Sequence, residues 1–150
     1  MEEDKGLLDL GVSQLGKDVL KAVLEYIERL KGKVNLHTVI VFGSRVRGDY
    51  EPWSDVDLVI IADDLSQGIE RMRMFYSVER GAAIEPRPYT REEFLMAIEA
   101  IDITAWDSIC DGVVILDDGF WKSAKEKFTE VRERYGLVRT KTGWRALDPS

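Results

Sequence analysis

Residues 43–60 read "GSRVRGDYEPWSDVDLVI" and directly follow the apolar run "TVIVF". A Gly-Ser pair leaves a predicted strand, a polar loop follows, and two carboxylates then alternate with apolar residues. Successive side chains of a strand point to opposite faces. Asp55 and Asp57 are therefore expected on one face, and Val56 and Leu58 on the other, in the core.

Two carboxylates held close together repel one another unless a cation lies between them. Their hard oxygen ligands favour Mg²⁺ or Mn²⁺ over zinc, and such an ion commonly binds substrate phosphates as well. Gly43 allows a tight turn and the close approach of a ligand, while Ser44 adds a hydroxyl donor. The backbone amides after this turn can bind a phosphate. The stretch therefore predicts a site for a nucleoside triphosphate and its metal.

Each feature taken alone has a simpler interpretation. A Gly-Ser turn is common after a strand, and an Asp-x-Asp pair is more often a solvated strand edge. Arg45 and Arg47 suit triphosphate oxygens, because the arginine fork matches phosphate, but surface charge explains them equally well. The combination of strand, Gly-Ser, loop, Asp-x-Asp and second strand is what favours a nucleotide site.

Gly43-Ser44, ten intervening residues and Asp55-Val56-Asp57 match the GS-x10-DxD signature of the DNA polymerase β-like nucleotidyltransferase superfamily. The chain resembles its short members, the minimal nucleotidyltransferases (MNT, or MntA-like), over residues 36–62 and more loosely to Phe94. The resemblance implies an α/β (α+β) fold of the polymerase β palm type, with a small mixed sheet flanked by helices. It also implies transfer of a nucleotidyl group from NTP, here ATP, with Mg²⁺ or Mn²⁺ as cofactor.

The resemblance further implies a third carboxylate from a later strand. The segment "AAIEPRPYT" offers only Glu85, one methylene longer than the aspartate that often stands there. Glu85 would join Asp55 and Asp57 as the catalytic and metal-binding set, and could act as general base for the incoming hydroxyl. Gly43, Ser44, Arg45 and Arg47 would bind the nucleotide; an exposed edge charge is the alternative for Glu85.

For the acceptor, the resemblance implies a tyrosine of a HEPN-domain partner, with this chain as the antitoxin of a toxin–antitoxin pair. The alternative is a catalytically inactive partner-binding module of the same fold. A third hypothesis is a nucleic-acid-modifying enzyme that uses Arg139, Lys141 and Arg145. The net charge of −7 argues against it, because affinity for nucleic acid depends on many cationic contacts.

Composition favours one domain over residues 1–150, since 150 residues with 45% apolar content suit a single core. The acidic N-terminus lacks signal-peptide features and no apolar run reaches the ~18–20 residues that span a bilayer. Cys110 is the single cysteine, which excludes an intrachain disulfide. We therefore expect a cytoplasmic protein with no membrane partner; its oligomeric state stays open.

Periodicity and capping signals predict the elements. The predicted helices are 13–31, 66–80, 90–100, 104–110 and 119–135, with a short helix or turn at 44–48. Ser13 is the expected N-cap of the first helix and Gly32 its stop. The second opens at Ser66 and ends at Gly81, with Ile69, Met72, Phe75 and Tyr76 inward. Thr90 and Glu93 stand at capping-box spacing at the start of the third. The predicted strands are 36–42, 55–62, 82–89 and 112–116. Pro86 and Pro88 favour a sheet edge for 82–89, or positions where no ladder donor is needed. The basic tail, 137–150, reads as a loose strand or as disordered. His37 is expected to be structural, Cys110 a core or helix-end residue, Trp106 and Trp121 core residues, and Trp53 part of the loop packing.

Overall fold

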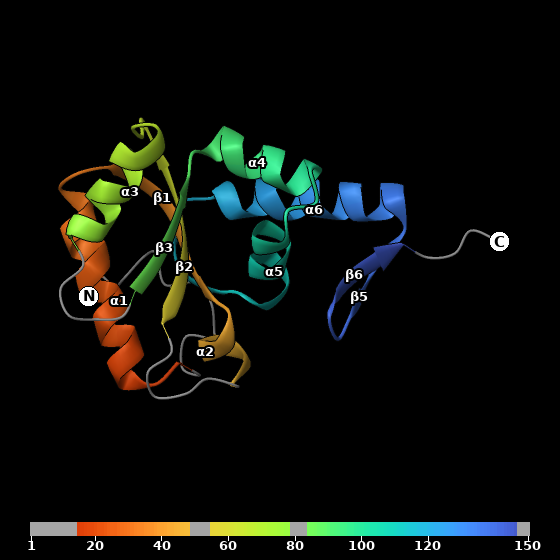
Figure 1. Ribbon diagram of the computed structural model, residues 1–150, viewed down its shortest axis with the longest axis horizontal. Helices are drawn as coiled ribbons and strands as arrows, with labels where there is room; N and C mark the ends of the chain where they lie inside the picture. Colours follow the sequence, from red (N-terminus) through yellow and green to blue (C-terminus); the bar gives the residue numbers. More distant parts are fainter. Residues whose placement is uncertain (1–14, 49–54, 79–83, 147–150) are drawn as a thin grey trace.

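The computed structural model describes residues 15–48, 55–78 and 84–146 (Figure 1). Ser13, Trp53 and Gly81, which carry three of the expectations above, lie outside these ranges. The elements in chain order are α1 (Lys17–Lys31), β1 (Asn35–Phe42), α2 (Ser44–Arg47), β2 (Val56–Asp63), α3 (Gly68–Ser77), β3 (Ile84–Tyr89), α4 (Arg91–Glu99), α5 (Ile103–Asp111), β4 (Val113–Asp117), α6 (Phe120–Tyr135), β5 (Leu137–Thr140) and β6 (Gly143–Ala146). Within the described ranges, no helix is long and apolar enough to cross a membrane.

The predicted small mixed sheet is confirmed, and its four strands lie in the order β3-β2-β1-β4. β1 pairs antiparallel with both β2 and β4, whereas β2 and β3 run parallel. β3 lies at the edge, which suits Pro86 and Pro88 because a proline cannot donate to the ladder. The pairing of β1 with β2 places Phe42 opposite Asp57.

Helices cover both faces of the sheet (Figure 1). Along β2, Val56, Leu58 and Ile60 belong to the core shared with α1 and α3. Val59 and Ile61 point the other way, into the core shared with α4, α5 and α6. The alternation predicted for this strand is therefore confirmed, and it fixes which face carries Asp57.

The start of α4 follows its predicted capping box. The Thr90 hydroxyl accepts from the Glu93 amide at 3.1 Å, and the Glu93 carboxylate accepts from the Thr90 amide at 2.9 Å. Arg71 of α3 also donates to Glu93 at 2.6 Å, which ties the two helices together and holds the pKa of Glu93 below its usual range.

The helix predicted over 66–80 is wrong in two respects. α3 begins at Gly68, with Gln67 rather than Ser66 as its N-cap. Ile69 and Tyr76, expected inward, are 71% and 43% exposed. α3 packs on the sheet through the side of the helix that carries Phe75. Each residue advances about 100° around a helix axis, so Tyr76 points away from that side.

The tail was predicted to be a loose strand or disordered, but its described part forms an antiparallel hairpin of β5 and β6. Trp144 of β6 packs edge-on against Trp106 at 4.8 Å and Phe128 at 5.9 Å between ring centroids. Arg139 donates to the Asp111 carboxylate at 2.6 Å. The sequence missed the hairpin because a tertiary aromatic cluster, rather than its own periodicity, holds it.

Candidate functional site

The predicted site residues gather at one end of the sheet. β1 ends at Phe42, the chain turns through Gly43 into α2, and β2 returns antiparallel, so its first residues lie beside that turn. β3 runs parallel to β2 and begins at the same end (Figure 1). The end of β1, α2 and the starts of β2 and β3 therefore surround one region.

Gly43 lies directly against Asp57. A Cβ atom at position 43 would stand 2.4 Å from Asp57 Oδ2, closer than real Cβ atoms approach other atoms. Gly43 also has φ +86° and ψ −154°, a conformation that is essentially restricted to glycine. Only glycine fits here for both reasons, so the Gly-Ser turn and the second aspartate form one local structure, as the sequence predicts.

The three predicted carboxylates come from neighbouring backbone positions. Asp57 of β2 is the register partner of Glu85 of β3, so their side chains leave the same face of the sheet. Asp55 stands exposed immediately before β2, two residues from the half-buried Asp57. The sheet thus brings together residues about thirty positions apart in the chain.

The electrostatics of Asp57 reflect this crowding. Burial raises the pKa of the Asp57 carboxyl, and the charges of Glu85 and Asp55 raise it further. The cations Arg87 and Arg47 act in the opposite direction without cancelling the shift. A positive charge placed beside Asp57 would therefore stabilise its ionised form.

Tyr76 of α3 lies beside the candidate site, in a position that the sequence did not predict. Its hydroxyl donates to Glu85 Oε2 at 2.9 Å, across the exposed edge of the sheet. Burial raises the pKa of Tyr76, and the hydrogen bond and charge of Glu85 add to the rise. The sequence offered only the apolar periodicity of this helix, which predicted that Tyr76 points into the core.

The side-chain types in this region suit a divalent cation, whereas their present arrangement suits it less well. The fold family implies Mg²⁺. The carboxylates of Asp55 and Asp57 suit such an ion, because the pKa of Asp57 is raised by burial and by its neighbours, and a cation would stabilise the ionised form. Over residues 15–48, 55–78 and 84–146, however, no three His, Cys, Asp or Glu side chains converge as a metal-binding group. Glu85 is turned to Tyr76, so it would have to adjust to become a third ligand.

A family comparison identifies the chain. The profile of the nucleotidyltransferase domain matches residues 20–105, which is more than half of the chain and includes the turn, both aspartates and Glu85. The chain belongs to the nucleotidyltransferase domain family. This confirms the resemblance and the enzyme class that the sequence predicted.

One curated relative of this nucleotidyltransferase is a candidate protein adenylyltransferase of Methanocaldococcus jannaschii. The two chains are 42% identical over 45 residues, which are 29% of this chain and 45% of the relative. The aligned segment therefore spans less than half of the length of that relative.

Solved structures show the same fold. A chain of a toxin–antitoxin complex crystallised with AMP-PNP superposes with a TM-score of 0.54 at 14% identity, covering 74% of this nucleotidyltransferase and 90% of that chain. A chain of the MntA–HepT toxin–antitoxin has a TM-score of 0.50 at 11% identity, with 79% and 92% covered. At these identities the likeness establishes the α/β fold with its mixed sheet.

The remaining predicted residues of this nucleotidyltransferase surround the turn. Ser44 and Arg45 are half-buried at the start of α2, and Arg47 is exposed at its end. The Gly43 carbonyl accepts from the amides of Val46 and Arg47 at 3.0 and 3.1 Å, which closes the helical turn. The first amides of a helix have no intrahelical acceptor, so those of Ser44 and Arg45 are the ones suited to a phosphate.

His37 lies near the opposite end of β1 and takes no part in the site. Its Nε2 is 2.7 Å from Asp63 and its Nδ1 is 2.5 Å from Asp118. The structural role expected for His37 fits this position, but its two carboxylate partners were not apparent from the sequence. Burial lowers the pKa of His37, while the hydrogen bonds to Asp118 and Asp63 outweigh that effect and raise it.

Proposed function

We propose that this chain transfers an AMP group from ATP to the hydroxyl of an acceptor, in a reaction that depends on a divalent cation. The observation that carries the proposal is the packing of Gly43 against Asp57, with Glu85 as the register neighbour of Asp57. A turn that accepts only glycine, beside crowded carboxylates, suits a triphosphate and its counter-ion.

The residues take distinct roles in this proposal. Asp55 and Asp57 would hold Mg²⁺, which would supply positive charge to the phosphates and the leaving pyrophosphate. The Ser44 hydroxyl and the first amides of α2 bind phosphate oxygens, and Arg47 adds charge on the same side. Glu85 accepts the proton of the acceptor hydroxyl as the oxygen attacks the α-phosphorus.

For the acceptor we propose a tyrosine of a HEPN-domain partner, with this chain as the antitoxin of the pair. The similarity to a candidate protein adenylyltransferase supports a protein acceptor. The folds shared with toxin–antitoxin complexes, one of them with AMP-PNP, support this partner class and an adenine nucleotide.

A second candidate function is a partner-binding module without catalysis. The hydrogen bond that turns Glu85 to Tyr76, away from a shared ligand set with Asp55 and Asp57, favours it. The two functions differ in whether a labelled nucleotide is transferred.

The test uses purified protein, labelled ATP, Mg²⁺ and a purified HEPN-domain protein as the acceptor. The proposal predicts label on the partner with the wild type and at least a hundredfold less with Asp57→Asn. Asp64→Asn is the matched control, because Asp64 is exposed just past the opposite end of β2. Equal labelling by the Asp57 variant would refute the site, and partner binding without any label would establish the module instead.

A further inference from the structure

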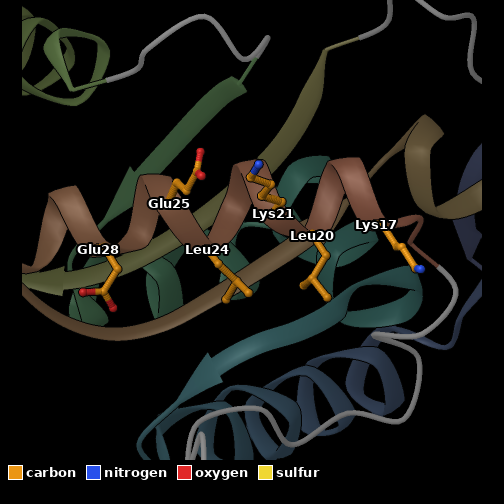
Figure 2. A pocket seen from close by; sticks show the side chains of 6 residues that line it. All are labelled: Lys17, Leu20, Lys21, Leu24, Glu25 and Glu28. Atoms are coloured by element: carbon orange, nitrogen blue, oxygen red, sulfur yellow. The ribbon is translucent and has the colours of Figure 1, made fainter.

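A groove along the outer face of α1 lies apart from the nucleotide site. Six side chains of this one helix line it: Lys17, Leu20, Lys21, Leu24, Glu25 and Glu28. Figure 2 shows Leu20 and Leu24 side by side at its centre, between Lys17 at one end and Glu28 at the other. We call this set the α1 stripe. Leu24 is 37% exposed, although the opposite face of α1 is buried in the core.

The charge order of the α1 stripe runs against the preference of an isolated helix. Anionic side chains are stabilised near a helix N-terminus and cationic ones near its C-terminus. The stripe instead places Lys17 in the first turn and Glu28 in the last, and Lys21 precedes Glu25 in the weaker order for an i,i+4 pair. Lys31 offsets part of the cost through a 3.1 Å ion pair with Glu28. Elsewhere α1 follows the preference, with Asp18 in its first turn and Arg29 and Lys31 in its last. The reversed order is confined to the stripe, which suggests a role for the stripe outside the helix.

The charge order along the α1 stripe is complementary to the same order read in the opposite direction, as a second, antiparallel copy would present it. When a second α1 is laid antiparallel across the first, with the two-fold axis midway between Leu20 and Leu24, Lys17 faces Glu28 of the other copy. Lys21 then faces Glu25, and the leucines of the two copies meet at the centre. Two-fold interfaces between identical chains require this kind of self-complementarity, in which each contact occurs twice.

We propose that the α1 stripe is a homodimerisation surface, at which two copies of this chain pack their α1 helices antiparallel. The proposal is independent of the nucleotide chemistry, since none of the six residues belongs to the candidate site. The stripe is roughly 16 Å long, at a rise of 1.5 Å per residue, so the interface is smaller than the ~1,200–2,000 Å² of stable complexes. The dimer is therefore expected to be weak and to depend on concentration and salt.

Sedimentation velocity of the full chain over a concentration series tests the proposal. The dissociation constant should rise at least about tenfold in Lys17→Glu/Lys21→Glu and in Glu25→Lys/Glu28→Lys, because each variant makes the stripe carry one sign of charge. An equimolar mixture of the two should form a heterodimer, since the acidic stripe then faces the basic one. Lys122→Glu/Lys125→Glu is the matched control for the lysine variant, with the same change in net charge on exposed positions of α6.

Leu24→Ala adds a variant without any change in charge, and should also weaken the dimer about tenfold. Recovery of association in the mixture shows in itself that both charge variants fold. A wild type that stays monomeric up to about 1 mM would overturn the proposal. So would a dimer that none of the stripe variants weakens, or stripe variants that lose a different protein partner while the oligomeric state is unchanged.

Discussion

Glu85 of β3 is the register partner of Asp57 of β2, and both side chains leave the same face of the sheet. This relationship is the structural basis of the proposed site, because it places a third carboxylate beside the Asp-x-Asp pair. The same crowding disfavours the ionised form of Asp57, which has a measurable consequence for stability.

Replacing Asp57 by asparagine should leave the cation-free protein equally stable or more stable at neutral pH. The pKa of Asp57 is raised in the folded state, so this carboxyl favours folding below its unfolded pKa of about 3.9, and the contribution is lost as pH rises through the folded pKa. Asparagine cannot ionise, so the variant does not lose this stability as the pH rises.

Thermal unfolding with and without MgCl₂ measures this effect. Added Mg²⁺ should raise the unfolding temperature of the wild type and leave that of Asp57→Asn unchanged, with Asp64→Asn as the control that still responds. A loss of more than about 1 kcal/mol in the cation-free Asp57 variant would contradict the account.

Gly43→Ala should destabilise the protein by about 3 kcal/mol or more and abolish nucleotide binding. The backbone strain alone is worth about 1–3 kcal/mol, and the new methyl group would displace Asp57. Gly48→Ala is the matched control: φ there is +88°, but no atom of the described residues lies within 4 Å of an added Cβ, so about 1–2 kcal/mol is expected. Urea unfolding and calorimetric titration with an ATP analogue measure the two effects. Equal costs at the two positions would show that contact with Asp57 is unimportant.

Tyr76→Phe should slow transfer about three- to tenfold without changing the affinity for nucleotide. The lost hydroxyl orients Glu85 through a 2.9 Å hydrogen bond but is expected to touch neither ATP nor the metal. Tyr76 is 43% exposed, so the fold should tolerate the change. Steady-state kinetics separate the two effects: kcat falls, KM for ATP stays, and the pH–rate profile moves. Tyr135→Phe, at an exposed tyrosine of α6, should leave all three unchanged.

His37 should make the protein more stable in mild acid than in mild alkali. Its pKa is raised by Asp118 and Asp63, so protonated His37 contributes stability that is fully present below its unfolded pKa of about 6.5. That contribution is lost as pH rises through the folded pKa. Because His37 is the single histidine, NMR can follow its titration directly. His37→Gln should flatten the dependence of unfolding free energy on pH between about 6 and 8; an unchanged slope would contradict the role of the two carboxylates.

The sequence predicted the features that local rules govern. The alternation along β2, the edge position of the proline-bearing β3 and the capping box at Thr90 each depend on residues a few positions apart. The Gly-Ser turn beside Asp57 was predictable because a joint pattern of turn, spacing and strand leaves few other arrangements.

The features that the sequence missed depend on tertiary contacts rather than on local patterns. His37 meets Asp118 across 81 positions, and Trp144 meets Trp106 only because the hairpin folds back onto α5. Tyr76 looked like a core residue because an apolar periodicity does not show where the sheet ends. Its bond to Glu85 depends on α3 lying next to an edge strand.

A crystal structure of the protein soaked with Mn²⁺ and AMP-PNP tests the proposed site, because anomalous scattering locates the metal. We expect a manganese peak at the carboxylate oxygens of Asp55 and Asp57, with the triphosphate against Gly43 and Ser44. Manganese bound elsewhere, or a triphosphate lying away from that turn, would contradict the proposed site.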